Sequence, residues 1–195
     1  MTTALEVATL VLERVRDPEG VATTINQVYD LIDRVQVLLV RGLGLMARDR
    51  TFSSEPDQTL YPVDPDETLQ ILDLFQGAVN RRLSPCRWAQ MIQVRRDWWR
   101  YSILDGEVPE TMQVWAPVGT SLLVMWPPSD TFAEIVTVRE QQRPAMVTEA
   151  SSVLDLPDEH LPLLQDIVEV LLLLRTKHVE AAEIAMGRLE PQKEE

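Results

Sequence analysis

The sequence predicts an α+β fold in which a helical bundle built on two long helices carries a small antiparallel β-sheet. Apolar residues repeat at three- and four-residue steps over residues 24–47 and again over residues 157–186, which is typical of helices. Between these segments lie short runs of alternating residues punctuated by Gly and Pro, which is typical of strands joined by turns. With 195 residues and 45% hydrophobic content, the chain can bury a core, and we expect one domain over residues 1–195.

The first part of the chain is predicted to form two helices. Residues 3–15 have apolar side chains at helical spacing and end at the breaker Asp17-Pro18-Glu19-Gly20. The second helix is predicted over residues 24–47, with Thr23 or Thr24 as the N-cap, because a hydroxyl there can accept a bond from a free backbone N–H. Residues 48–65 are rich in Asp, Ser and Pro and are predicted to form a loop.

The middle of the chain is predicted to be mixed. Residues 68–75 favour a strand that pairs with residues 79–83 in a hairpin, although Asp66 and Glu67 could equally open a helix. Ser84 and Pro85 resemble an N-cap and a first-turn proline, and they predict a helix over residues 85–100. Three further strands are predicted, the first two paired around the turn at residues 117–119: residues 111–116, 121–126 and 133–140.

The last helix is predicted to begin between Pro157 and Pro162 and to continue to about Met186. Residues 170–174 are apolar all round, so most faces of this helix must be covered by the other helices or by neighbouring subunits. The end of the chain is polar, and we expect a mobile tail from about residue 187.

Charge is unevenly distributed along the chain. Residues 1–100 carry 14 acids and 12 bases, whereas residues 101–195 carry 17 acids and six bases. Such a surface repels a nucleic-acid backbone and argues against general DNA binding through the C-terminal half. The acid could line a passage through which DNA slides, or simply keep the protein monodisperse.

No pattern predicts catalysis, a cofactor or a metal. His160 and His178 lie at opposite ends of the last predicted helix, about 27 Å apart along its axis, so they cannot share an ion within one subunit. Cys86 is the only cysteine, which excludes an intrachain disulfide, and no histidine lies near it in sequence to form a nucleophile–base pair. The acidic residues 64–67 lack the glycine and the distal glutamate of a calcium loop. We therefore expect a protein that is not an enzyme.

The sequence also predicts no targeting or membrane segment. Glu6 and Glu13 interrupt the apolar residues at the N-terminus, unlike a signal peptide. The longest uncharged run, residues 111–129, contains Gly119 and three prolines, which a membrane-spanning helix would hardly tolerate. We expect synthesis in a cytoplasm.

Arginines and tryptophans cluster over residues 81–100. This mixture can bind single-stranded nucleic acid through phosphate contacts and base stacking. Alternatively, the tryptophans anchor a core or an interface, and the arginines pair with acids of the same or a neighbouring subunit. Both interpretations predict a subunit or partner interface at five residues: Trp88, Arg95, Arg96, Trp98 and Trp99.

The second half of the chain has a characteristic order of motifs. Trp98-Trp99 is followed by Gly106-Glu107-Val108-Pro109, strands that end in Pro127-Pro128, and Leu156-Pro157 opening the last helix. Together with the long early helix, this order resembles the head-to-tail adaptor (connector, or neck) proteins of tailed bacteriophages over about residues 22–186. The chain departs from that pattern in the helix predicted before Pro18, in Pro162 and in the doubled tryptophan.

The resemblance implies a structural virion protein, made in the host cytoplasm, that assembles at the head–tail junction as a ring of about twelve copies. Such adaptors commonly contact the portal protein through their C-terminal segment and a tail or nozzle protein through the opposite face, while DNA passes through the channel without specific binding. Carried over by position, the portal contact falls on six residues: Glu183, Met186, Arg188, Leu189, Pro191 and Lys193.

Two alternatives stay open. A tail-completion or other neck protein would bind tail components rather than the portal. A nucleic-acid-binding module would show salt-dependent DNA binding that weakens when Arg95 and Arg96 are changed.

Overall fold

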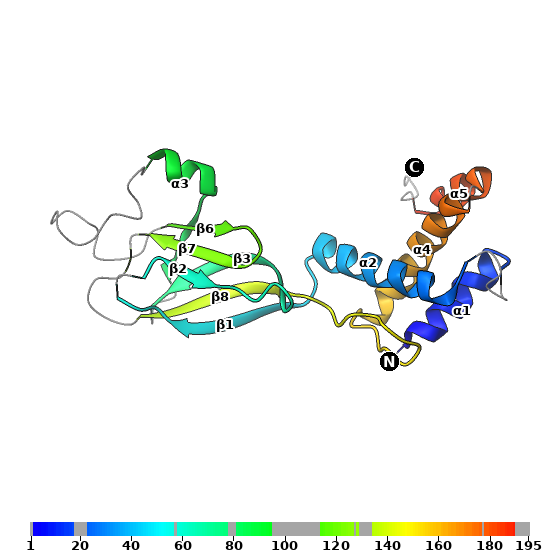
Figure 1. Ribbon diagram of the computed structural model, residues 1–195, viewed down its shortest axis with the longest axis horizontal. Helices are drawn as coiled ribbons and strands as arrows, with labels where there is room; N and C mark the ends of the chain where they lie inside the picture. The colour runs from blue at the N-terminus through cyan, green and yellow to red at the C-terminus, as the bar shows by residue number, and fades with distance from the viewer. Residues whose placement is uncertain are drawn as a thin grey trace, which may run out of the picture. The chain divides into compact units, whose positions relative to one another are not determined.

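The computed structural model describes residues 2–17, 23–56, 58–77, 81–94, 114–126, 128, 134–176 and 178–189. The chain separates into two compact units. The first, Met1–Leu45 with Pro144–Glu195, contains the helices α1, α2, α4 and α5 and is called the helical unit. The second, Met46–Arg143, contains the strands and α3 and is called the sheet unit (Figure 1). Compactness alone does not define a domain, so the single adaptor domain remains a prediction.

The prediction of a helical bundle with one small sheet is wrong. The described residues form five α-helices and two sheets of four strands each. The strands therefore build a unit of their own. Part of the error lies in the predicted loop at residues 48–65, which contributes β1 (Ala47–Ser53) and β2 (Leu60–Pro62).

The first two helices begin where the sequence predicts. In α1 (Ala4–Arg14), Thr3 Oγ1 accepts a hydrogen bond from the Glu6 amide, and Glu6 Oε2 accepts one from the Thr3 amide. Thr24 is the N-cap of α2 (Ile25–Leu43). This helix ends earlier than predicted because Gly44 adopts the left-handed conformation, with φ of 68°.

The predicted last helix is three elements: a short 3-10 helix (Asp158–His160), α4 (Leu161–Arg175) and α5 (Val179–Met186). The Thr176 hydroxyl donates to the carbonyls of Leu172 and Leu173, at 3.0 and 3.2 Å, where α4 ends. The core of the helical unit collects apolar side chains from α1, α2 and α4: Val7, Val11, Ile32, Val35, Leu164, Val168 and Leu172.

The first sheet has the strand order β1-β8-β3-β4, with β3 at Thr68–Gln76, β4 at Arg81–Arg82 and β8 at Ile135–Gln142. Its neighbouring strands are antiparallel. The predicted strands at residues 68–75 and 133–140 are thus confirmed, although the second begins and ends about two residues later.

The second sheet has the order β2-β7-β6-β5, with β5 at Ser84–Pro85, β6 at Val114–Val118 and β7 at Leu122–Trp126. The predicted pairing of residues 114–116 with 121–126 is confirmed, whereas residues 111–113 lie outside the described ranges. The predicted helix over residues 85–100 is α3 (Trp88–Val94) where it is described. Ser84 and Pro85 pair with β6 instead of capping the helix.

Both sheets contribute to the core of the sheet unit. One apolar cluster joins Leu74, Val136 and Val138 of the first sheet to Trp115, Leu123 and Met125 of the second. A separate cluster packs Met91 of α3 against Ala116, Val124 and Trp126. The second sheet is therefore covered by the first sheet on one face and by α3 on the other.

Candidate functional site

The end of the helical unit carries four of the six residues predicted to contact a portal. Glu183 and Met186 lie on α5 and are exposed, while Arg188 and Leu189 belong to the turn that follows it. Leu189 packs against an apolar cluster that joins α4 to α5: Val170, Leu173, Ala182 and Ala185. Pro191 and Lys193, and the predicted tail beyond Leu189, are not among the described residues.

The outer surface of α5 is unusually apolar for an exposed helix. Val179, Ile184 and Met186 expose 53%, 76% and 40% of their surface. Val179 and Met186 are seven residues apart and share one face of this helix, whereas Ile184 lies on another face. Grouped exposed apolar side chains are typical of surfaces that bind another protein.

An ion-pair cluster connects three segments of the helical unit through Glu169 of α4. Its Oε1 accepts a hydrogen bond of 2.5 Å from Arg188 Nη2, and its Oε2 lies 3.6 Å from Arg14 Nη1. Arg14 Nη1 also donates to Asp166 Oδ1 at 2.8 Å. The Glu169 carboxylate is buried and has lost most of its hydration. The two guanidinium groups compensate its negative charge in place of water.

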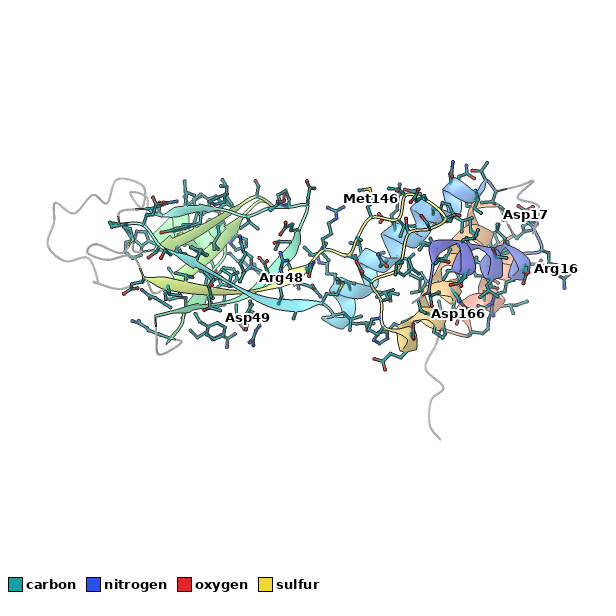
Figure 2. The ribbon with its side chains drawn as sticks, turned by 90° about the horizontal axis from the view of Figure 1, so that it is seen from below. Arg16, Asp17, Arg48, Asp49, Met146 and Asp166 are labelled. Atoms are coloured by element: carbon teal, nitrogen blue, oxygen red, sulfur yellow. The ribbon has the colours of Figure 1, made fainter. Side chains whose placement is uncertain are left out.

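A hollow of about 640 Å³ opens beside this cluster. Leu173, Ile184 and Val15 give it apolar walls. Three arginines and Glu169 add charge: Arg14, Arg16 and Arg188 line it together with His178. Figure 2 shows Arg16 at the end of α1, where the backbone adopts φ of 59°. The hollow can thus accept a segment that offers both apolar and anionic groups.

Of the five residues predicted for the Arg/Trp interface, the structure describes Trp88. It opens α3 and packs, partly buried, against the cluster around Met91 and Trp126. Arg95, Arg96, Trp98 and Trp99 lie outside the described ranges. The packing assigns Trp88 a structural role, and its interface role remains a prediction.

The described residues show little that could support chemistry. They contain no group of three or more His, Cys, Asp or Glu side chains that could hold a metal ion. Burial raises the pKa of the Cys86 thiol, which disfavours the reactive thiolate. Among the helices in the described part of the chain, none is long and apolar enough to cross a membrane.

Sequence reasoning missed the roles of Arg14, Arg16 and Glu169. Glu169 interrupts the apolar run of the last helix, and a charge inside such a run is a signal for a buried partner. Nothing in the local sequence identifies that partner, because Arg14 lies on a helix 152 residues earlier than the Asp166 it also binds.

Residues 2–189 match the family described as SU10 adaptor protein. A search of curated proteins found no significant match. The family match runs from the residue before the Thr3 cap to Leu189 and so includes both compact units.

Proposed function

The chain belongs to the SU10 adaptor protein family and is a structural adaptor of a phage virion; on this premise we propose that it forms a ring of about twelve copies between the portal and the tail. The observation that carries the proposal is the family match, which covers the helical unit and the sheet unit alike. An adaptor ring must bind itself, the portal protein and a tail or nozzle protein. The chain would therefore present at least three interfaces.

We assign the portal interface to the end of α5 and the residues after it. Met186 is exposed, and Val179, which is seven residues earlier on the same face of α5, adds apolar surface that a partner could cover. Glu183 and Arg188 offer charged groups at the edge of this surface, and Leu189, Pro191 and Lys193 extend it along the chain. Apolar anchors with charged neighbours are the composition expected of a specific interface.

The acidic surface suits the channel of the proposed ring. The chain has a formal net charge of −13, most of it in residues 101–195. DNA phosphates would be repelled by such a wall and could slide without binding specifically. This role requires that the excess acid face the channel in the assembled ring.

Native mass spectrometry of the protein alone and mixed with its cognate portal protein tests the proposal. We expect a portal-dependent ring that is lost when Val179 and Met186, which do not line the hollow, are both changed to Asp. The control is Ile135→Asp, which alters an isoleucine of the sheet unit that is 61% exposed. A wild-type chain that ignores the portal but binds a tail component would contradict the proposal and favour a tail-completion role. Salt-sensitive DNA binding lost in an Arg95 and Arg96 variant would instead favour a nucleic-acid-binding module.

A further inference from the structure

The hollow beside α1, α4 and α5 contains an unsatisfied acceptor. Glu169 is 5% exposed, and its Oε2 has no hydrogen-bond donor within the described part of the chain. Arg14 Nη1 lies 3.6 Å away, which supports ionic attraction but is too long for a hydrogen bond. A buried acceptor left without a donor is costly, so this oxygen can accept a bond from a group that enters the hollow.

The positive charge of the hollow favours binding of a segment that carries acidic side chains. Among the described residues, Arg14, Arg16 and Arg188 line the hollow together with a single acid, Glu169. This local excess of positive charge occurs in a chain whose net charge is −13. Arg14 and Arg188 already bind carboxylates of their own subunit, whereas no ion pair of Arg16 is recorded among the described residues. Arg16 is therefore the cation best placed to bind an external carboxylate.

The same helical unit presents an acidic tip at the other end of α4. Asp158 and Glu159 form the 3-10 turn that precedes α4, and both are exposed. The Glu159 carboxylate has one recorded partner, His160, at 3.4 Å. The tip thus offers carboxylates, which complement the arginines of the hollow.

The tip of one subunit cannot fill its own hollow. Helix α4 has 15 residues and is about 22 Å long, and the two features flank its opposite ends. A contact between them must therefore join two copies of the chain. Such a contact is heterologous, because each copy gives one surface and receives the other. Repeated heterologous contacts form a ring where the rotation between copies closes, and an open filament where it does not.

We propose that the hollow lined by Arg14, Arg16 and Arg188 receives the acidic tip at Asp158 and Glu159 of the neighbouring copy. The contact deepens, and rests on, the proposed ring. Arg16 binds a carboxylate of the tip, Ile184 contacts the neighbouring copy, and Glu169 Oε2 accepts a hydrogen bond from a backbone N–H of the incoming turn, because the carboxylates of the tip can only accept. The hollow is then a site that each subunit completes for the next.

Paired charge reversals of the full-length chain test the contact. Arg16→Glu and Glu159→Arg each place like charges in every contact, so each variant alone should need about tenfold more protein to half-assemble. An equimolar mixture of the two should regain assembly, because every contact in an alternating ring again joins opposite charges. Alternation also restricts the mixture to even-numbered rings, which native mass spectrometry can count.

Matched controls use an exposed acid and an exposed base of α2. Asp30→Arg and Arg41→Glu change charge by the same amounts on a helix that does not line the hollow, and both should assemble as the wild type does. Rings that form equally well with Arg16→Glu or Glu159→Arg would overturn the contact and leave the adaptor function intact. A mixture that fails to regain assembly would also overturn it. A wild type that stays monomeric at high concentration and with portal would overturn both proposals.

Discussion

Arg48 of β1 donates a hydrogen bond of 2.9 Å through Nε to Oε1 of Glu140, a β8 carboxylate that is fully buried. Arg50 Nε lies 3.5 Å from the other carboxylate oxygen, and the Thr68 hydroxyl donates to that oxygen at 3.1 Å. One acid thus holds β1 and β3 on either side of β8. This arrangement makes the sheet unit sensitive to the loss of a single cation.

We predict that Arg48→Met destabilises the sheet unit by about 3 kcal/mol, because Glu140 would lose its best partner while staying buried. Glu140→Met in the same chain should recover most of that loss, since an apolar pair leaves no buried charge. All five tryptophans belong to the sheet unit, so tryptophan fluorescence during urea unfolding measures the effect. Equal destabilisation by Arg82→Met, whose exposed side chain pairs with Asp73 in the same unit, would contradict this explanation.

Alanine substitutions at two glycines near the end of α2 should have opposite effects on the free energy of unfolding. Gly44→Ala should cost about 1 kcal/mol, because a side chain disfavours its φ of 68°. Gly42→Ala should stabilise by roughly 0.5–1 kcal/mol, since Gly42 is helical and a Cβ there meets no atom within 4 Å. Urea unfolding followed by far-ultraviolet circular dichroism measures both. Changes of the same sign would show that backbone conformation does not control this helix end.

Arg16→Gly should raise the stability of the helical unit while it weakens ring assembly. Arg16 and Met46 both have positive φ, 59° and 56°, so glycine at either position should stabilise its unit by about 1 kcal/mol. Only Arg16→Gly removes a cation from the hollow, and only this variant should weaken ring formation. Thermal unfolding and native mass spectrometry of both variants check the two effects. Weakened assembly in Met46→Gly would indicate a general effect of backbone strain.

Acid should remove the contribution of Asp49 to stability. Hydrogen bonds from Arg139, at 2.8 and 3.0 Å, hold the pKa of Asp49 below its ordinary value of 3.8. A lowered pKa in the folded state stabilises the protein above that ordinary value, and the stabilisation is lost as pH falls through the folded pKa. Asp49→Asn should therefore lower the urea midpoint at neutral pH, and this difference should shrink as pH falls below 3.8. In an Arg139→Gln background, the same change should show no such pH dependence.

Strands with local signals could be predicted from the sequence, whereas β1 could not. Residues 121–126 follow a glycine turn and are mostly apolar, so their pairing with β6 could be inferred locally. In β1, Arg48, Asp49 and Arg50 read as a solvated loop. They become a strand because Glu140 and Arg139 lie opposite them in β8, about 90 residues later. Pairing over that distance leaves no local pattern.

The last helix shows a similar limit. Its apolar spacing continues through Thr176 and His178 without glycine or proline, so local sequence favours one helix. The observed break lets Ala182 and Ala185 of α5 pack on Val170 and Leu173 of α4, which is a tertiary effect. The same packing brings Arg188 to Glu169 and forms one wall of the hollow. From the sequence, the candidate site could therefore be placed at the end of a helix, but the hollow itself could not be predicted.

The chain enters and leaves the sheet unit at neighbouring points, since the Gln142 amide donates to the Met46 carbonyl at 3.0 Å. Two covalent connections, at residues 45–46 and 143–144, therefore join the units. A mechanical load passed along the chain from one unit to the other is therefore shared by these two connections.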